Sequence, residues 1–382
     1  MNTLRSILSL LLPLLLLTGV TLPACAHDQA WREDLPPDYL SPLAPRDVTA
    51  TDDAGNLYVL IHELHAPSIT MQVRAPDGSW SPVSDTAIPM SFVINEFVTH
   101  PVTGNPVALG AESIGVPGAA LVAYEYTGAS WVRTEIHWPA AGYGCAFDYD
   151  ESGRLHFLYW DFDSGDLYYG SHAEGSTTTY PVSTLRGSSY RELEIQASSQ
   201  GTKPIYASAY EATGGFVFTT VSVNGGENWG VATVAGYGFT GSTYSGQQML
   251  TELDSEQRLH LFYRVELSGG DQFVRYRTLG LDGSLSAFDD LEFGSFGWNV
   301  FLLDDRPYYV AKVSRAGVPL VVSHLDADGW RSDEPDPGRS FSNLDGVDVV
   351  DGEVVVLATE HGSLDKHTYV TTTATLFKDS FE

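Results

Sequence analysis

Acidic residues recur at one place in a repeated pattern along this chain, each after a run of apolar and β-branched residues. They are Glu63, Glu112, Asp161, Glu211, Glu266 and Glu360. A rim of such carboxylates could bind cations, the hydroxyl groups of sugars or a basic partner. Like charges brought together also raise the pKa of some carboxyl groups toward the range used in acid–base catalysis. The alternative is that these acidic residues have no function and lie at the solvent-exposed end of a strand that recurs in each unit.

Basic residues are few in the same part of the pattern. Guanidinium groups bind carboxylates through two parallel hydrogen bonds, so three converging arginines could hold a uronate or a sialate. The trio best placed for this is Arg191, Arg264 and Arg315, with Lys312 and Arg339 nearby in the pattern. The alternative is that each arginine pairs with a neighbouring acid. The candidates for a catalytic role are Arg191, Arg264, Arg315, Glu63 and Asp161.

Aromatic residues gather in the connections between the repeated units. Rings exposed beside polar groups are typical of surfaces that bind the flat faces of sugars. The candidates are Tyr190, Tyr237, Tyr244 and Trp298, which together with the acidic rim form the predicted ligand-binding set. The alternative is that these rings fill the interior.

Metal-binding patterns are incomplete. Asp161–Asp166 has the spacing of the first half of a calcium loop but lacks the acid at its twelfth position. The segment His62–His65 matches no established metal-ligand spacing. Both segments are also typical of loops and hairpin turns. The sequence therefore predicts no cofactor and no metal, with Ca²⁺ as the open alternative.

Charge and composition exclude several classes of protein. The chain has 382 residues, with 20 basic and 49 acidic side chains and a net charge of -29. This charge repels phosphate backbones and excludes a nucleic-acid partner. A hydrophobic content of 43% is sufficient for a packed core and excludes a disordered chain. The 37 glycines and 20 tyrosines favour strands and turns over helices.

Two phrases repeat along the chain and define its units. The first is a turn followed by an extended run, with anchors at Gly55, Gly104, Gly153, Gly201, Gln257, Asp305 and Gly352. The second is a Gly-containing turn that ends in an aromatic or apolar residue, as in Asp77–Trp80 and Gly226–Trp229. Each unit then holds four short strands, as a β-propeller blade does. The prediction is an all-β, seven-bladed β-propeller with four-stranded blades. The alternative is a tandem of two smaller all-β domains, although it does not explain why both phrases keep the same spacing along the whole chain.

The last unit lacks an outer strand of its own, and a segment near Trp31 resembles the missing piece. We therefore expect this N-terminal strand to pair with the last blade and close the ring, which removes free sheet edges. The predicted organisation is a signal peptide at 1–26, the closing segment at 27–45, the propeller at 46–377 and a tail at 378–382.

The first 26 residues have the features of a secretory signal, with Arg5 before an apolar run and small residues at the cleavage site. The chain is therefore predicted to be exported to the periplasm or beyond, and to be a monomer. Cys25 lies in a segment like a bacterial lipobox, so an outer-membrane lipoprotein is the alternative, and a membrane contact is expected only through this signal or lipid. Cys145, in an apolar strand, is predicted to be a buried, inert thiol.

The segment 222–229 resembles the Asp-box of sialidase-type and BNR-repeat propellers, Ser-x-Asp-x-Gly-x-x-Trp. Its structural residues would be Ser222, Asn224 (at the Asp place), Gly226 and Trp229. The resemblance implies a turn held by side-chain hydrogen bonds and a tryptophan wedged between blades. Bacterial exported propellers of this kind include sialidases, but the Phe/Tyr-Arg-Ile-Pro motif of sialidases is missing from the sequence.

Two hypotheses about function follow. The first is a non-catalytic module that binds an extracellular glycan or protein. The second is a carbohydrate-active enzyme, a sialidase-like hydrolase or a polysaccharide lyase. Its site would lie on the face of the propeller that carries the connections between the repeated units. Fold alone does not choose between them, because propellers carry many chemistries.

Overall fold

The computed structural model describes the strands of the predicted propeller and the turns that join many of them. The described residues are 32–34, 49–61, 68–89, 91–113, 119–140, 144–161, 164, 166–182, 185, 190–198, 204–211, 214–237, 248–267, 272–292, 294–313, 320–335, 339–350, 353–360 and 366–372. All belong to one compact unit, Trp31–Glu382. This part of the chain contains strands and turns but no helix, so it also holds no helix that could span a membrane.

Several predictions from the sequence concern residues that are not among those described. The segments and side chains outside the described residues are 1–26 with Cys25, Glu63, the segment His62–His65, Tyr244, Arg315 and the tail 378–382.

Each sheet has four antiparallel strands, and six sheets keep the order of the chain from one edge to the other. We call these six sheets blades one to six. Blade one contains β2 (Thr49–Thr51), β3 (Leu57–Ile61), β4 (Ser68–Arg74) and β5 (Trp80–Pro89). Blade two contains β6 (Phe92–Thr99), β7 (Pro106–Ser113), β8 (Ala119–Tyr126) and β9 (Trp131–Ala140). Blade three contains β10 (Cys145–Tyr149), β11 (Leu155–Trp160), β12 (Leu167–Ala173) and β13 (Ser176–Pro181).

The remaining sheets repeat this plan. Blade four contains β14 (Tyr190–Ala197), β15 (Ile205–Glu211), β16 (Phe216–Ser222) and β17 (Thr233–Tyr237). Blade five contains β18 (Met249–Leu253), β19 (Leu259–Glu266), β20 (Gln272–Leu279) and β21 (Asp289–Glu292). Blade six contains β22 (Gly294–Leu303), β23 (Arg306–Val313), β24 (Leu320–Asp326) and β25 (Gly329–Asp333). The closing sheet contains β26 (Phe341–Val350), β27 (Glu353–Glu360), β28 (Lys366–Thr372) and β1 (Arg32–Asp34).

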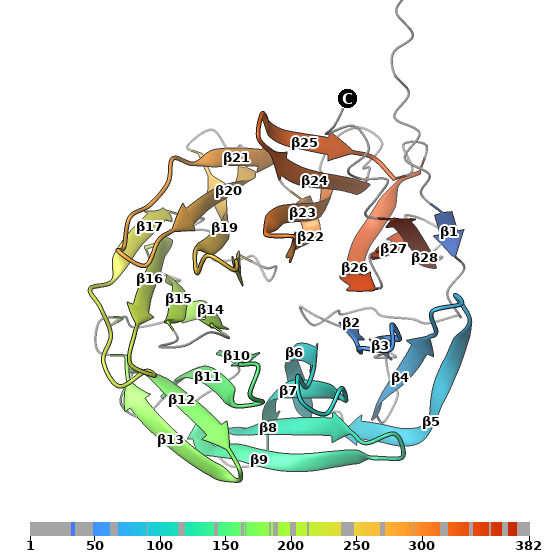
Figure 1. Ribbon diagram of the computed structural model, residues 1–382, viewed down its shortest axis with the longest axis horizontal. Helices are drawn as coiled ribbons and strands as arrows, with labels where there is room; N and C mark the ends of the chain where they lie inside the picture. Colours follow the sequence, from blue (N-terminus) through green and yellow to red (C-terminus); the bar gives the residue numbers. More distant parts are fainter. Residues whose placement is uncertain are drawn as a thin grey trace, which may run out of the picture. The chain divides into compact units, whose positions relative to one another are not determined.

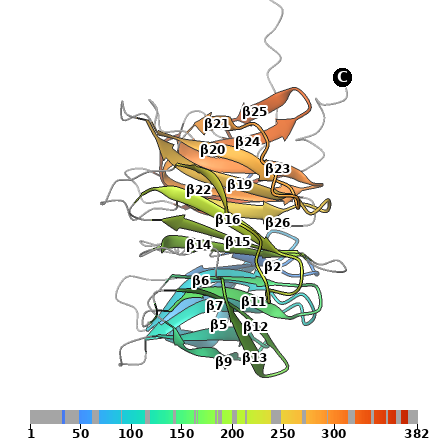
Figure 2. The same ribbon diagram turned by 90° about the vertical axis from the view of Figure 1, so that its left-hand side faces the viewer.

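The sheets are arranged radially, as propeller blades. The first strand of each sheet lies innermost, around a common centre, and the fourth lies at the outside (Figure 1). Innermost strands of successive sheets contact one another, and β26 of the closing sheet contacts β2 of blade one. Seen from the side, the sheets stand face to face (Figure 2).

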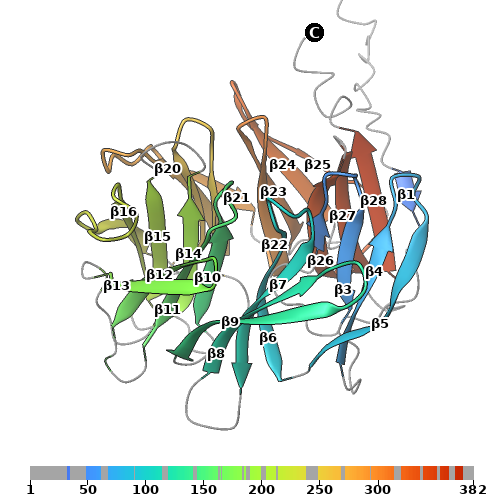
Figure 3. The same cartoon turned by 60° about the horizontal axis from the view of Figure 1, so that its bottom comes forward.

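The closing sheet is built from both ends of the described chain. Strand β1 pairs antiparallel with β28, and Glu33 lies opposite Tyr369. Figure 3 shows β1 beside β28 at the edge of this sheet. The pairing of the segment next to Trp31 with the last unit was expected from the sequence.

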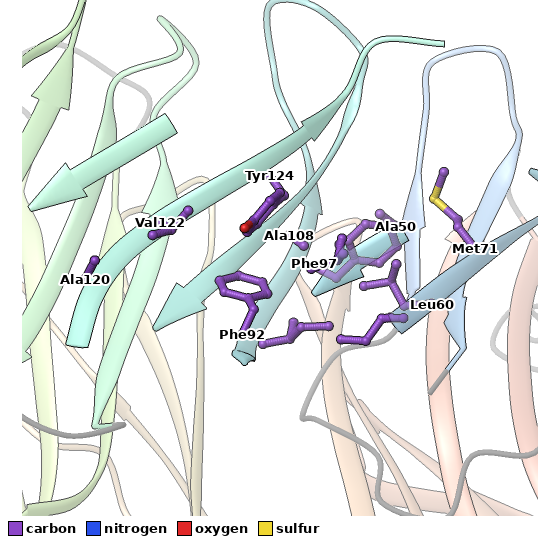
Figure 4. Packing of buried hydrophobic residues seen from close by; sticks show 12 residues of the cluster. Ala50, Leu60, Met71, Phe92, Phe97, Ala108, Ala120, Val122 and Tyr124 are labelled. Atoms are coloured by element: carbon purple, nitrogen blue, oxygen red, sulfur yellow. The ribbon is translucent and has the colours of Figure 1, made fainter. Parts of the chain in front are cut away.

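Side chains alternate between the two faces of each strand, so every sheet contributes to two interfaces. Between blades one and two, Leu60 and Met71 pack against Phe92 and Phe97, and all four are buried. Figure 4 shows these side chains meeting between the two sheets. The core is therefore a series of apolar layers between neighbouring sheets.

Five of the repeated anchors of the sequence are turns in the left-handed backbone region, and the other two, Gly201 and Gly352, lie outside the described residues. The φ values at Gly55, Gly104 and Gly153 are 76°, 70° and 80°. Gln257 and Asp305 occupy the equivalent turns of blades five and six with φ values of 63° and 60°. A side chain at such a φ costs roughly 1–2 kcal/mol relative to glycine.

Gln257→Gly is accordingly expected to raise the free energy of unfolding by about 1 kcal/mol, because it removes this backbone strain. Gly104→Ala is the matched control: its φ is +70° and a Cβ there meets no atom within 4 Å, so only the strain is added. Chemical denaturation should show changes of opposite sign for the two variants. A loss of stability in Gln257→Gly would contradict the expectation.

Candidate functional site

The two rims of the propeller differ in the segments that they carry. The anchor turns and the Trp-containing turns join first to second and third to fourth strands, so they lie on one face. We call the opposite face the loop face. It carries the ends of the second strands and the crossings from one sheet to the next, where the predicted ligand-binding residues fall.

Blade four brings three of these predicted residues to a single edge. Tyr190, the first residue of β14, lies opposite Glu211, the last residue of β15. Next along the same edge, Phe216 begins β16 and lies opposite Tyr237, which ends β17. We call these four residues the blade-four rim.

The aromatic part of the blade-four rim is open to solvent. Tyr237 is 65% exposed, and its ring centroid lies 4.8 Å from that of Phe216. The Phe216 ring stacks in turn on Phe218, at 5.6 Å. Phe216 also covers Gly214, where a Cβ would meet the ring at 2.4 Å and the Glu211 carboxylate at 2.9 Å. A carboxylate and an exposed ring thus lie at one edge.

The sequence did not identify Phe216 and Phe218 as site residues. Their spacing of two on a third strand indicates that they share one face of the sheet. This face is turned toward blade three, because Phe218 packs against the apolar cluster between blades three and four, to which Leu158 and Tyr169 belong.

The predicted carboxylate rim is only partly present. Asp161, Glu211, Glu266 and Glu360 are half-buried at the ends of their second strands. Asp161 accepts a hydrogen bond from the Ser164 amide at 2.8 Å, which holds a turn. No group of three or more metal-binding side chains occurs among the described residues.

Glu112 is an interior group, which corrects the prediction of an exposed carboxylate. It is 8% exposed and accepts hydrogen bonds from Arg133 Nε at 2.8 Å and from the Tyr124 hydroxyl at 3.0 Å. Burial, followed by the hydrogen bond to Glu112, raises the pKa of Tyr124 to about 12. The glutamate serves the packing between blades one and two.

Of the arginine trio, only Arg264 has a described side chain. It is fully buried, and its Nη2 donates to Gln272 Oε1 at 2.9 Å. The expectation of a surface arginine was wrong at this position, because Arg264 lies on the same strand face as buried Phe262. Arg191 lies within β14. The described residues therefore do not bring three arginines together.

Trp298 was expected to be an exposed ring and is instead 3% exposed. It packs 5.9 Å from Tyr309 in the layer between blades five and six. A register shift between Gly294 and Trp298 changes the alternation of β22 before this residue. The aromatic residues predicted to bind a ligand thus differ in burial, because Tyr237 lies at the surface and Trp298 lies in the core.

The Asp-box turn has the structure that the resemblance implies. The Ser222 hydroxyl accepts from the Gly226 amide at 2.9 Å, and Asn224 Oδ1 accepts from the Asn228 amide at 3.0 Å. Trp229 packs edge-on against Tyr169 of blade three, at 5.6 Å. Asn224 therefore supplies the acceptor that aspartate would supply.

Buried polar groups of blades three and five have packing roles. His156 contacts the Tyr169 hydroxyl at 2.8 Å, and His260 contacts the Tyr276 hydroxyl at 2.9 Å in the equivalent place. The repetition indicates a packing role for both histidines. Cys145 is buried, as predicted, and its Sγ lies 3.2 Å from Asn95 Oδ1.

One carboxylate joins the innermost strands of blades three and four. Asp148 Oδ2 accepts from the Ala197 amide at 2.7 Å. Burial raises the pKa of Asp148 to about 7, while the hydrogen bonds from Ala197 and Tyr149 oppose that rise. Asp148 therefore changes its charge near neutral pH, within the seam below the blade-four rim.

No protein-family model and no curated protein matches the chain. Solved structures do. A PL25 ulvan lyase has 13% sequence identity and a TM-score of 0.55, over 90% of this chain and 96% of that one. The polysaccharide lyase Uly1 has 10% identity and a TM-score of 0.53, over 91% and 94%. The NanB sialidase from Streptococcus pneumoniae has 13% identity and a TM-score of 0.45, over 90% and 71%. At these identities the two lyases show a shared fold.

Proposed function

We propose that this chain is an exported, monomeric, seven-bladed β-propeller that binds a glycan on its loop face. The closing sheet would be the seventh blade, supported by the contact of β26 with β2 and the pairing of β1 with β28. The signal-like segment 1–26 supports export, with lipidation at Cys25 as the alternative. The geometry of the Asp-box turn supports kinship with BNR-repeat propellers.

The blade-four rim is the observation that carries the glycan proposal. Sugars present flat apolar faces bounded by hydroxyl groups, and an exposed ring beside a carboxylate complements both. Tyr237 supplies the ring, held by Phe216, and Glu211 supplies hydrogen-bond acceptors at the same edge. The lyases of similar fold act on polysaccharides, which favours this class of ligand.

Tyr237→Ala tests the proposal. We expect it to weaken binding of an oligosaccharide found by glycan-array screening roughly tenfold, since an aromatic contact contributes about 1 kcal/mol or slightly more. Phe288→Ala is the matched control, because Phe288 is an exposed ring of blade five, 50% exposed, outside the blade-four rim. Calorimetric titration of both variants gives the affinities. Equal losses in the two variants would remove the blade-four rim as the site.

A carbohydrate-active enzyme is the second candidate, favoured by the same lyases of similar fold. Against it, two of the acidic and basic groups proposed from the sequence, Glu112 and Arg264, are buried and hydrogen-bonded within the protein. Mass spectrometry of the glycan after incubation separates the two functions. Intact, retained glycan supports binding alone, and shortened products that disappear in Tyr237→Ala support the enzyme.

A further inference from the structure

The Asp-box turn of blade four carries the only Asn-Gly pair of the sequence, Asn224-Gly225. The turn joins β16 to β17, so it lies on the face opposite the loop face, and the proposed glycan site does not include it. An asparagine followed by a glycine is especially prone to lose its side-chain amide, because no side chain shields the glycine nitrogen. One product of that reaction is aspartate, the residue that the Asp-box pattern has at this place.

The atoms that would react are accessible. Asn224 and Gly225 are both exposed, and a Cβ built on Gly225 meets no atom within 4 Å. Neither the Gly225 amide nor the Asn224 side-chain nitrogen donates a hydrogen bond to any residue that the structure describes. The nitrogen that attacks and the nitrogen that leaves therefore have no hydrogen bond to these residues that must first be broken.

The side-chain oxygen of Asn224, in contrast, accepts from two donors. The Ser222 hydroxyl donates to Oδ1 at 3.0 Å, and the Asn228 amide donates to the same atom at 3.0 Å. Ser222 is fully buried, and its Oγ accepts from the Gly226 amide at 2.9 Å, so the hydroxyl group is fixed in place. Fixed donors on a carbonyl oxygen stabilise the negative charge that develops there when a nucleophile adds to the carbon.

We propose that Asn224 is a modification site, at which the Asp-box turn converts its own asparagine to aspartate without an enzyme. The Gly225 nitrogen bonds to Cγ of Asn224 and gives up its proton, the Cγ–Nδ2 bond breaks, and ammonia leaves a cyclic imide behind. Water then adds to Cγ, and the bond from Cγ to the Gly225 nitrogen breaks. This second step restores the backbone amide and leaves a carboxylate. The reaction consumes water, releases ammonia and needs no oxidant.

The same two donors also favour one product over the other. Water that adds to the backbone carbonyl carbon of Asn224 gives isoaspartate, which lengthens the backbone by one methylene group inside the turn. The longer backbone would move the Gly226 amide away from Ser222 Oγ. Donors on Oδ1 direct water to Cγ instead, and the aspartate formed there keeps both hydrogen bonds in a charge-assisted form.

Incubation of the purified protein at mildly alkaline pH, followed by peptide mapping with mass spectrometry, tests the proposal. We expect Asn224 to react at least as fast in the folded protein as in the chain unfolded in urea. The folded protein should also give the larger share of aspartate, measured from fragment spectra that distinguish aspartate from isoaspartate. Asn228 is the internal control: it is exposed in the same turn but is followed by Trp229, so it should persist.

Two variants separate the role of the hydroxyl group from that of the glycine. Ser222→Ala removes one donor to Oδ1 and should slow the reaction roughly two- to tenfold in the folded protein, the value of a neutral hydrogen bond. It should leave the rate in the unfolded chain unchanged. Gly225→Ala should slow the reaction in both states, because its Cβ shields the attacking nitrogen. Melting curves establish that each variant is folded during the incubation.

Two results would overturn the proposal. The first is a slower reaction of Asn224 in the folded protein than in the unfolded chain, which would show that the turn protects the asparagine. The second is a faster reaction in folded Ser222→Ala, which would assign a protecting role to the hydroxyl group. Because the turn and the blade-four rim lie at opposite ends of the strand pair β16 and β17, neither result depends on whether Tyr237→Ala weakens glycan binding.

Discussion

Gly226→Ala is expected to lower the free energy of unfolding by about 2–5 kcal/mol. The φ of Gly226 is +88°, which costs an alanine roughly 1–2 kcal/mol. A Cβ there would also meet the Tyr169 ring of blade three at 1.9 Å. Tyr169 is 1% exposed and cannot move without disturbing the core, so overpacking adds about 1–3 kcal/mol. Chemical denaturation followed by tryptophan fluorescence measures the loss.

The neighbouring glycine provides the control for this prediction. Gly225 has a φ of +73°, and a Cβ there meets no atom within 4 Å. Gly225→Ala should therefore cost only the backbone strain, roughly 1–2 kcal/mol. Equal losses in the two variants would mean that contact with Tyr169 does not restrict Gly226.

Asp148→Asn is expected to stabilise the protein at pH 7 and to leave it nearly unchanged at pH 4. The folded-state pKa of Asp148, about 7, lies above its ordinary value of 3.8. Well below pH 3.8 the carboxyl group is protonated in both the folded and the unfolded chain. Between pH 4 and pH 7 only the unfolded chain loses the proton, so the folded state loses roughly 3 kcal/mol of relative stability.

Asparagine removes this pH dependence and keeps an acceptor for the Ala197 amide. The difference in unfolding free energy between Asp148→Asn and wild type should therefore grow as the pH rises from 4 to 7. Asp150 is the charged neighbour that also raises the pKa of Asp148, and His156 is its partner on the adjacent strand.

Asp77→Asn is a control of opposite sign. Hydrogen bonds from the Ser79 hydroxyl and amide lower the pKa of Asp77, so its carboxylate stabilises the folded state at neutral pH, and this contribution is lost in acid. A flat pH profile for the Asp148→Asn difference would show that Asp148 is ionised throughout this range.

The features that were predicted from sequence are those set by local chemistry. The anchor turns need a residue that can adopt the left-handed backbone conformation. The Asp-box turn needs a hydroxyl group, a hydrogen-bond acceptor and a glycine within five positions. Both requirements appear directly as residue types at fixed spacing. The pairing of β1 with β28 was also predictable, because the segment at Trp31 resembles the fourth-strand segments of the other units.

The errors concern which way a side chain faces. Arg264 shares a strand face with Phe262, so a period of two could have placed it inside. Trp298 could not have been placed in this way, because the register shift in β22 interrupts that period. The burial of Glu112 depends on Tyr124 and Arg133, whose approach follows from the pairing of β8 with β7 and of β9 with β8. The blade-four rim likewise required the register of four strands.

The pairing of β1 with β28 also determines the order in which the chain can fold. Arg32 and Val370 are strand partners although nearly the whole sequence separates them. Bringing the two ends together costs conformational entropy, and only the contacts of this pairing offset that cost. We therefore expect β1 and β28 to pair late in folding. In the export proposed above, the N-terminus would enter the new compartment first, and β1 would lack its partner until almost all of the protein had arrived. During that interval the unpaired edge of β1 is the place where a chaperone, or another copy of the chain, would bind first.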